Sequence, residues 1–150
     1  MPTLATNKHA RFHYDILDEF EAGIALTGAE VKAVRLGQVN LKGSYVSIHE
    51  NIPLLFNCHI SPYAPAKGNQ RHYLPTRPRL LLLREAEIKN LIGKSSVQGL
   101  TLIPLSLYTK GSLIKVSLGL GRGKKQHDKR ATVKKRETER NIRRALKRSR

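Results

Sequence analysis

The last 29 residues, Arg122 to Arg150, carry too much like charge to join a folded core. They hold 14 of the 28 Lys and Arg of the chain and only three acidic residues, a net charge of +11. The other 121 residues carry a net charge of only +6. Blocks of like charge this dense usually serve as interaction tails, and each cation that neutralises a phosphate releases a counterion. We therefore predict a folded domain over residues 1–121 and a basic, polyanion-seeking tail over residues 122–150. The alternative is a solvated tail that only aids solubility.

The remaining length allows one domain of about 120 residues with a single core. The sequence contains no run of 18 apolar residues, and Met1 to Arg11 lacks the apolar segment of a signal peptide, so we expect a cytoplasmic protein. The single cysteine, Cys58, cannot form an internal disulfide. Its alternating apolar context favours a small buried side chain over a nucleophile.

Two pairs of alternating apolar runs predict β-hairpins. Tyr45–Ile48 and Leu54–Ile60 flank a turn that contains Glu50, Asn51 and Pro53, and Leu100–Leu107 and Leu113–Leu120 flank Gly111. The side chains expected on one face are Leu54, Phe56, Cys58 and Ile60 in the first hairpin, and Ile114, Val116 and Leu118 in the second. The short apolar runs Ile24–Leu26 and Leu80–Leu83 are candidate buried strands, although periodicity alone does not separate them from helix.

Two short amphipathic segments predict helices. Ala29–Leu36 is followed by Gly37 and Arg84–Ile92 by Gly93, the residue type that most often ends a helix in a left-handed conformation. Both are too short to be stable alone and must pack on a sheet. The predicted fold is mainly β with short helices (α+β), and a compact β-barrel is favoured over a parallel α/β fold.

The segment Ser61–Pro78 contains four prolines and is expected to be a surface loop. Basic and aromatic side chains in and beside it are candidates for RNA contact, with Tyr73 offering a stacking face. These side chains are Arg71, His72, Tyr73, Arg77 and Arg79. A solvated loop without a ligand is the alternative.

No catalytic pattern is found in the sequence. The six histidines show no metal-ligand spacing, and the carboxylates occupy ordinary polar positions. Gly119, Gly121 and Gly123 precede Lys124 and Lys125, but the spacing is not that of a nucleotide-binding loop. We interpret this run as a flexible basic hinge that can approach phosphates closely. We therefore expect neither an enzyme, nor a metal site, nor a cofactor.

Several sequence blocks, in order and over nearly the whole chain, resemble the SsrA-binding protein family, also called small protein B. The blocks are Asn7–Ala10, Glu21–Lys32, Arg35–Gly37, Asn40–Leu41, Ser44–Tyr45, His59–Tyr63, Arg77–Arg79, Leu81–Leu83, Leu105–Tyr108 and Gly123–Arg130. The sequence departs from the family pattern at Leu80, where a lysine is usual, and at Ala29, where Trp or Thr is more common. Leu80 removes one positive charge from the expected RNA face.

The resemblance implies an oligonucleotide-binding-like closed β-barrel with flanking helices and a basic C-terminal tail that is disordered in solution. Members of the family catalyse no reaction. They bind the tRNA-like domain of transfer-messenger RNA, which is charged with alanine and escorted by elongation factor Tu, and bring it to stalled ribosomes. The tail enters the vacant decoding centre and mRNA channel and becomes helical there, and trans-translation then tags the nascent peptide.

The resemblance also implies roles for individual residues. The RNA-binding set is Asn7, Lys8, Arg11, Glu21, Arg35, Arg79, Leu82, Lys115, Gly123, Lys124 and Lys125. The ribosome-binding tail set is Asp128, Lys129, Arg130, Lys134, Lys135, Arg136 and Ile142. Glu21 would accept hydrogen bonds from a base or a 2′-hydroxyl, or instead pair with a neighbouring Arg. Leu82 would pack under an unstacked base, or instead in the core.

Composition alone would fit a ribosomal protein or a ribosome-assembly factor equally well, because both combine a basic barrel with an extension into rRNA. The ordered blocks favour the SsrA-binding protein family. An RNA-processing enzyme would require a catalytic constellation that the sequence does not contain.

Overall fold

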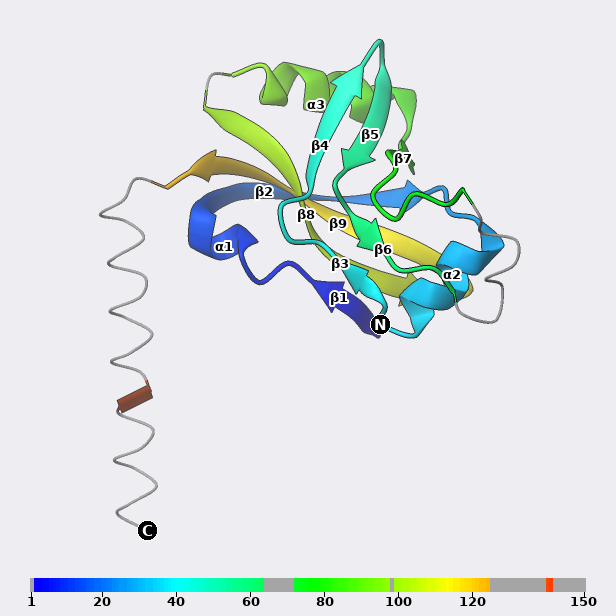
Figure 1. The fold of residues 1–150 in the computed structure, drawn as a ribbon. Coiled ribbons are helices and arrows are strands. Elements are labelled where there is room, and N and C mark those ends of the chain that lie inside the picture. The colour runs from blue at the N-terminus through cyan, green and yellow to red at the C-terminus, as the bar shows by residue number, and fades with distance from the viewer. Residues whose placement is uncertain (1, 64–71, 98, 125–139, 142–150) are drawn as a thin grey trace.

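The fold is mainly β with three short helices among the described residues, as predicted (Figure 1). The computed structural model describes residues 2–63, 72–97, 99–124 and 140–141. The elements, in chain order, are β1 Thr3–Thr6, α1 Ala10–His13, β2 Tyr14–Ile24, α2 Gly28–Arg35, β3 Val39–Asn40, β4 Tyr45–His49, β5 Ile52–Phe56, β6 His59–Ile60, β7 Arg79–Leu82, α3 Glu85–Ser95, β8 Leu100–Lys110 and β9 Leu113–Gly123. None of the helices in the described ranges is long and apolar enough to cross a membrane.

The main sheet has seven strands in the order β1-β8-β4-β5-β7-β2-β9, and β8 also pairs with β9. Because β9 pairs with β8, the strands β8, β4, β5, β7, β2 and β9 form a ring, and β1 pairs with β8. In Figure 1 the long strands β2, β8 and β9 run through the centre, α3 lies beside the β4–β5 hairpin, and α1 and α2 lie at opposite ends. Short strands β3 and β6 form a separate antiparallel pair.

The core lies inside this ring and is built from alternate residues of the strands. Ile114, Val116 and Leu118 are buried on one face of β9, as predicted, while Lys115 and Ser117 face outward. The β8–β9 register shifts next to Pro104, which has no N–H to donate to the ladder. Both predicted hairpins are confirmed by the pairings of β4 with β5 and of β8 with β9.

The predicted face of the first hairpin is wrong in its first half. Leu55 is fully buried, whereas Leu54 and Phe56 are only half-buried; Cys58 and Ile60 are buried as expected. The alternation is interrupted by Asn57, whose φ of 62° places it in the left-handed region and ends β5. The even-numbered residues therefore face away from the core before Asn57, at Leu54 and Phe56, and toward it after Asn57, at Cys58 and Ile60.

Both predicted helices are present, with different ends. Gly37, with φ of 77°, follows α2 as expected, and Thr27 and Glu30 cap its start reciprocally. The prediction that Gly93 ends the second helix is wrong, because α3 continues to Ser95. In this last part of the helix, Lys94 Nζ lies 3.0 Å from the Asp18 carboxylate and 5.1 Å from the centroid of the Phe20 ring.

The prediction of a flexible hinge is wrong for Gly119 and Gly121, because both lie within a paired strand. Gly119 and Gly121 are buried in β9 and paired on both sides. A Cβ atom at Gly119 would lie 3.0 Å from Leu105, and one at Gly121 would lie 3.0 Å from Tyr14, so these residues are glycine because side chains cross the strand there. Strand β9 continues to Gly123, two residues beyond the predicted domain boundary at residue 121.

Candidate nucleic-acid interface

Three of the predicted RNA-binding residues, Glu21, Leu82 and Lys115, converge on one outer face of the sheet. Gly23 of β2 is the point where they meet, because it pairs with Leu82 of β7 on one side and with Lys115 of β9 on the other. All three line one open hollow of about 720 Å³, which we call the Glu21 surface. Its other lining residues are Gly23, Asn51, Ile52, Pro53, Leu80, Leu81, Leu83, Arg84, Glu87 and Ile88.

Glu21 is held by two donors from β8. The Tyr108 hydroxyl donates to Oε2 of Glu21, and Lys110 Nζ donates to Oε1 across 3.1 Å. No arginine among the described residues pairs with Glu21, so the expected arginine pairing is replaced by these two contacts. The Tyr108 hydrogen bond, followed by that of Lys110, lowers the pKa of Glu21. Burial and the neighbouring carboxylate raise the pKa of Tyr108 to about 12, so a neutral phenol meets an ionised carboxylate at neutral pH.

Leu82 is not a core residue. Strand β7 alternates, with Arg79 and Leu81 buried and Leu80 and Leu82 facing outward at 40% and 54% exposure. Leu82 lies over Gly23, where a Cβ atom would come within 3.1 Å of the Leu82 Cβ. The absence of a side chain at Gly23 thus lets an exposed leucine lie flat on the sheet, beside Glu21 and Lys115. The alternative of core packing for Leu82 is therefore excluded.

The predicted N-terminal residues extend the same face. Asn7, Lys8 and Arg11 line a polar hollow of about 520 Å³ together with Glu19 and Ser117. Ser117 pairs directly with Glu21, so this hollow adjoins the Glu21 surface.

Cations at the rim of this face are tied to neighbouring groups. Arg11 Nη2 lies 2.7 Å from a Glu19 oxygen, and both side chains remain exposed. Arg35 Nη2 donates to the Ser112 carbonyl across 3.2 Å, at the turn between β8 and β9. Most of strand β2 was not predicted, because its acidic residues interrupt the alternation of apolar and polar side chains. In the folded chain each of Asp18, Glu19 and Glu21 forms an ion pair, with Lys94, Arg11 and Lys110 respectively.

Arg79, predicted as an RNA contact, is instead fully buried and cannot reach RNA. Its Nε and Nη2 atoms donate to Glu30 Oε2 across 2.8 and 2.6 Å, and it also donates to the Cys58 and Pro75 carbonyls. Arg77 donates to the same carboxylate.

Tyr73 is half-buried, and its hydroxyl lies 3.0 Å from a Glu30 oxygen and 2.9 Å from the Ile60 carbonyl oxygen. Its role as a stacking face stays a prediction. Burial, reinforced by Glu30, raises the pKa of Tyr73 to about 12. Arg71 lies outside the described residues. The buried carboxylate of Glu30 thus holds the described part of this loop through Tyr73, Arg77 and Arg79. Sequence reasoning did not predict this role of Glu30.

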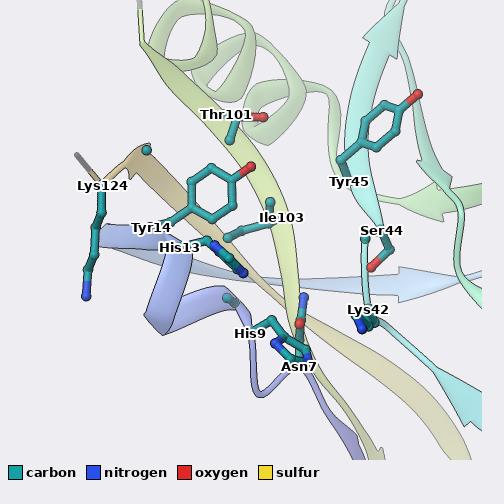
Figure 2. A pocket seen from close by; sticks show the side chains of 13 residues that line it. Asn7, His9, His13, Tyr14, Lys42, Ser44, Tyr45, Thr101, Ile103 and Lys124 are labelled. Carbon is teal, nitrogen blue, oxygen red and sulfur yellow. The ribbon is translucent and has the colours of Figure 1, made fainter. Parts of the chain in front are cut away.

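A second hollow of about 720 Å³ lies between α1, the start of β4 and the end of β9 (Figure 2). We call it the α1 pocket; its lining is Asn7, His9, Ala10, His13, Tyr14, Lys42, Gly43, Ser44, Tyr45, Thr101, Ile103, Gly123 and Lys124. Three predicted RNA-binding residues, Asn7, Gly123 and Lys124, line this pocket and do not line the Glu21 surface, and Asn7 also lines the N-terminal hollow. Lys124 Nζ donates to the Arg11 carbonyl across 2.7 Å.

Lys125 and all seven residues of the predicted ribosome-binding set lie outside the described residues. The set is Asp128, Lys129, Arg130, Lys134, Lys135, Arg136 and Ile142. Within the described ranges, no group of three or more His, Cys, Asp or Glu side chains is arranged to hold a metal ion. Cys58 is fully buried, as expected, and burial raises the pKa of its thiol to about 11.

Comparison with known proteins gives a consistent result. The family model described as SmpB protein matches residues 4–148. The chain is 51% identical to the SsrA-binding protein of Gloeothece citriformis, over 97% of this chain and 93% of that protein. It is 50% identical to the SsrA-binding protein of Acaryochloris marina, over 97% and 94% of the two chains. A solved structure described as "tmRNA-SmpB: a journey to the center of the bacterial ribosome" superposes with a TM-score of 0.68 at 43% identity, over 84% of this chain and 87% of that one.

Proposed function

Because this chain belongs to the SmpB protein family, we propose that it binds the tRNA-like domain of transfer-messenger RNA and delivers that RNA to stalled ribosomes for trans-translation. The observation that carries the proposal is the convergence of Glu21, Leu82 and Lys115 on one outer face. These residues come from three separate strands, and each one offers a different kind of contact to RNA.

The chemistry of the Glu21 surface suits a folded RNA. Lys115 in the hollow, and Lys110 beside it through its ion pair with Glu21, supply cations for phosphates. Leu80 and Leu82 supply an apolar area for a ribose or an unstacked base. Glu21 repels phosphate, so its role is to accept from a 2′-hydroxyl or a base edge while it holds Tyr108 and Lys110 in place. Asn7, Lys8 and Arg11 continue the contact toward the N-terminus, and Arg35 extends it past the β8–β9 turn.

Family membership also suggests a more specific fold assignment. We assign the ring of strands to a closed β-barrel of the oligonucleotide-binding type, supported by the pairing of β9, the last strand of the order, with β8, the second strand. The domain would end near Gly123, followed by the basic tail that enters the vacant decoding centre and mRNA channel. Elongation factor Tu is an indirect partner through the charged RNA, and the site of action is the cytoplasm.

A binding measurement with the full chain and an isolated tRNA-like RNA domain tests the proposal. Lys115→Ala should weaken binding by about 1 to 3 kcal/mol, the range of a charge-assisted contact. Lys89→Ala is the matched control, because Lys89 is an exposed lysine on α3 that lines none of the three hollows. It should leave the affinity nearly unchanged.

Equal losses in the two variants would mean that only total charge matters and would refute a specific Glu21 surface. Recovery of the protein from cells with rRNA but without enriched transfer-messenger RNA would favour the ribosomal-protein alternative instead.

A further inference from the structure

We propose that the α1 pocket binds one unpaired nucleotide of an RNA partner, with its base between Tyr14 and Tyr45 and its phosphate near Lys42 or Lys124. This inference rests on the proposed RNA-binding function but concerns a different site. The pocket shares only Asn7 with the N-terminal hollow and no residue with the Glu21 surface.

Charge is the first argument for this ligand. The pocket is lined by two lysines and two histidines, and no Asp or Glu of the described chain contributes to it. The other two hollows each include acidic side chains, Glu21 and Glu87 in one and Glu19 in the other. A concave site that presents two lysines and no carboxylate of the described chain favours an anionic ligand. Its volume of about 720 Å³ lies within the range of small-ligand sites, about 300 to 1,000 Å³.

The aromatic walls argue for a base rather than a bare phosphate. In Figure 2, Tyr14 and Tyr45 project on either side of Thr101 and Ile103 of β8. Tyr45 is 42% exposed, and its ring stacks on that of Phe56 with centroids 5.3 Å apart and 16° between the planes. This contact holds the Tyr45 ring in one orientation before any ligand arrives. Aromatic side chains in positive grooves stack on bases with little sequence preference.

Tyr14 is fixed by an equally specific feature. It begins β2 and lies over Gly121, where a Cβ atom would come within 3.0 Å of the Tyr14 Cβ and 3.4 Å of its Cγ. The glycine therefore sets the position of this wall, and Ile103 forms an apolar floor between the two rings.

An unsatisfied polar atom provides the third argument. Asn7 Nδ2 donates to the Pro104 carbonyl across 2.9 Å, but its Oδ1 is buried and accepts no hydrogen bond from the described chain. A buried acceptor without a partner is uncommon in native structures. The amino or imino N–H of a nucleobase is a suitable donor for this acceptor, because Asn7 lines the pocket.

The pocket also lies where the basic tail begins, because Lys124 directly follows β9. A nucleotide held here is thus placed at the root of the tail, whereas the tRNA-like domain is assigned to the Glu21 surface. RNA is consequently favoured over a free nucleotide, since adjoining phosphates would meet further cations along the chain.

The test is an NMR titration of the isotope-labelled full chain with inorganic phosphate, the four nucleoside monophosphates and a short single-stranded RNA. We expect saturable shifts at Gly43, Tyr45 and Thr101, and none at Gly23 or Lys115. The RNA should bind more tightly than any monophosphate, and phosphate alone should bind most weakly. Tyr45→Leu should weaken RNA binding at this site roughly 5- to 150-fold, the range of one base–aromatic stack.

Tyr108→Leu is the control, because it removes a tyrosine from the other face. It should leave the α1-pocket titration unchanged while it weakens binding of the tRNA-like domain. This contrast keeps the two proposals apart, since either site can fail alone. The inference is overturned by shifts that do not saturate, by phosphate binding as tightly as the nucleotides, or by monophosphates binding as tightly as RNA. It is also overturned if Tyr45→Leu, shown to be folded by its unshifted core methyl signals, binds RNA at this site like the wild type.

Discussion

Arg79 and Glu30, 49 residues apart in the chain, form a salt bridge in which both side chains are completely buried. Two guanidinium nitrogens donate to one carboxylate oxygen, and Arg77 and the Thr27 amide donate to the other. The remaining donors of Arg79 meet the Cys58 and Pro75 carbonyls. The cluster therefore joins α2 to β7 and to the segment before β7, and these contacts offset the cost of removing the charges from water.

Replacement of Glu30 by Gln should lower the free energy of unfolding by about 3 to 5 kcal/mol, because it leaves Arg79 buried and unpaired. Urea unfolding followed by circular dichroism measures this. Glu85→Gln is the matched control, since Glu85 is highly exposed and lies 3.7 Å from Lys89 on the surface of α3. The control should change stability by less than about 0.5 kcal/mol. A similar loss in both variants would contradict the role of the buried cluster.

The same carboxylate should make stability depend on pH. Burial raises the pKa of Glu30, but hydrogen bonds from Arg77, the Thr27 amide and Arg79 outweigh it and hold the folded pKa below its ordinary value of 4.5. A group with a lowered folded pKa contributes stability that is complete above its unfolded pKa and is lost as the pH falls through the folded value.

We therefore expect the free energy of unfolding to fall as the pH drops below the ordinary glutamate pKa of 4.5, and to fall less steeply in Glu30→Gln. Unfolding curves at several pH values measure the two slopes. Asp18 and Glu21 also have lowered pKa values and remain in both proteins, so the difference between the slopes isolates Glu30. Parallel slopes would show that Glu30 is not the titrating group.

Two glycine substitutions should have opposite effects on stability. Gly119→Ala should destabilise by about 1 to 3 kcal/mol, because the new Cβ would lie 3.0 to 3.1 Å from Leu105 side-chain atoms in a packed region. Gly93→Ala should stabilise by about 0.5 to 1 kcal/mol, since Gly93 lies inside α3 with open space around it. Thermal unfolding compares the two. A neutral Gly119→Ala would mean that Leu105 moves aside without cost.

The tail should be separable from the domain in RNA binding. Deletion after Gln126, or alanine at Asp128, Lys129 and Arg130, should leave affinity for the tRNA-like domain within about tenfold of wild type, or about 1.4 kcal/mol. The same variants should fail to support peptide tagging on stalled ribosomes. A tail scrambled from Asp128 to Arg150 at constant composition distinguishes position from charge, because counterion release does not depend on residue order. Full tagging with the scrambled tail would refute a position-specific role.

Local pattern was sufficient for much of this fold. The alternation in Ile114, Val116 and Leu118, the turn at Gly111 and the left-handed Gly37 each follow from a preference that neighbouring residues express on their own. The concentration of charge from Arg122 onward predicts a separate tail by composition alone. The ordered sequence blocks identified the family, and they selected Glu21, Leu82 and Lys115, which the fold brings to one hollow.

Only the tertiary structure decided which charges face solvent and which lie inside. Arg79 and Lys115 are both cations in apolar strands, yet Arg79 is buried because Glu30, far away in sequence, supplies its counter-charge, whereas Lys115 faces outward beside Glu21. Sequence alone predicts a hinge at Gly119 and Gly121, whereas in the folded chain the side chains of Leu105 and Tyr14 pack directly over these two glycines. In each case the outcome depends on a partner brought close by strand pairing, and the energy of a long-range contact is not encoded in the residues next to it.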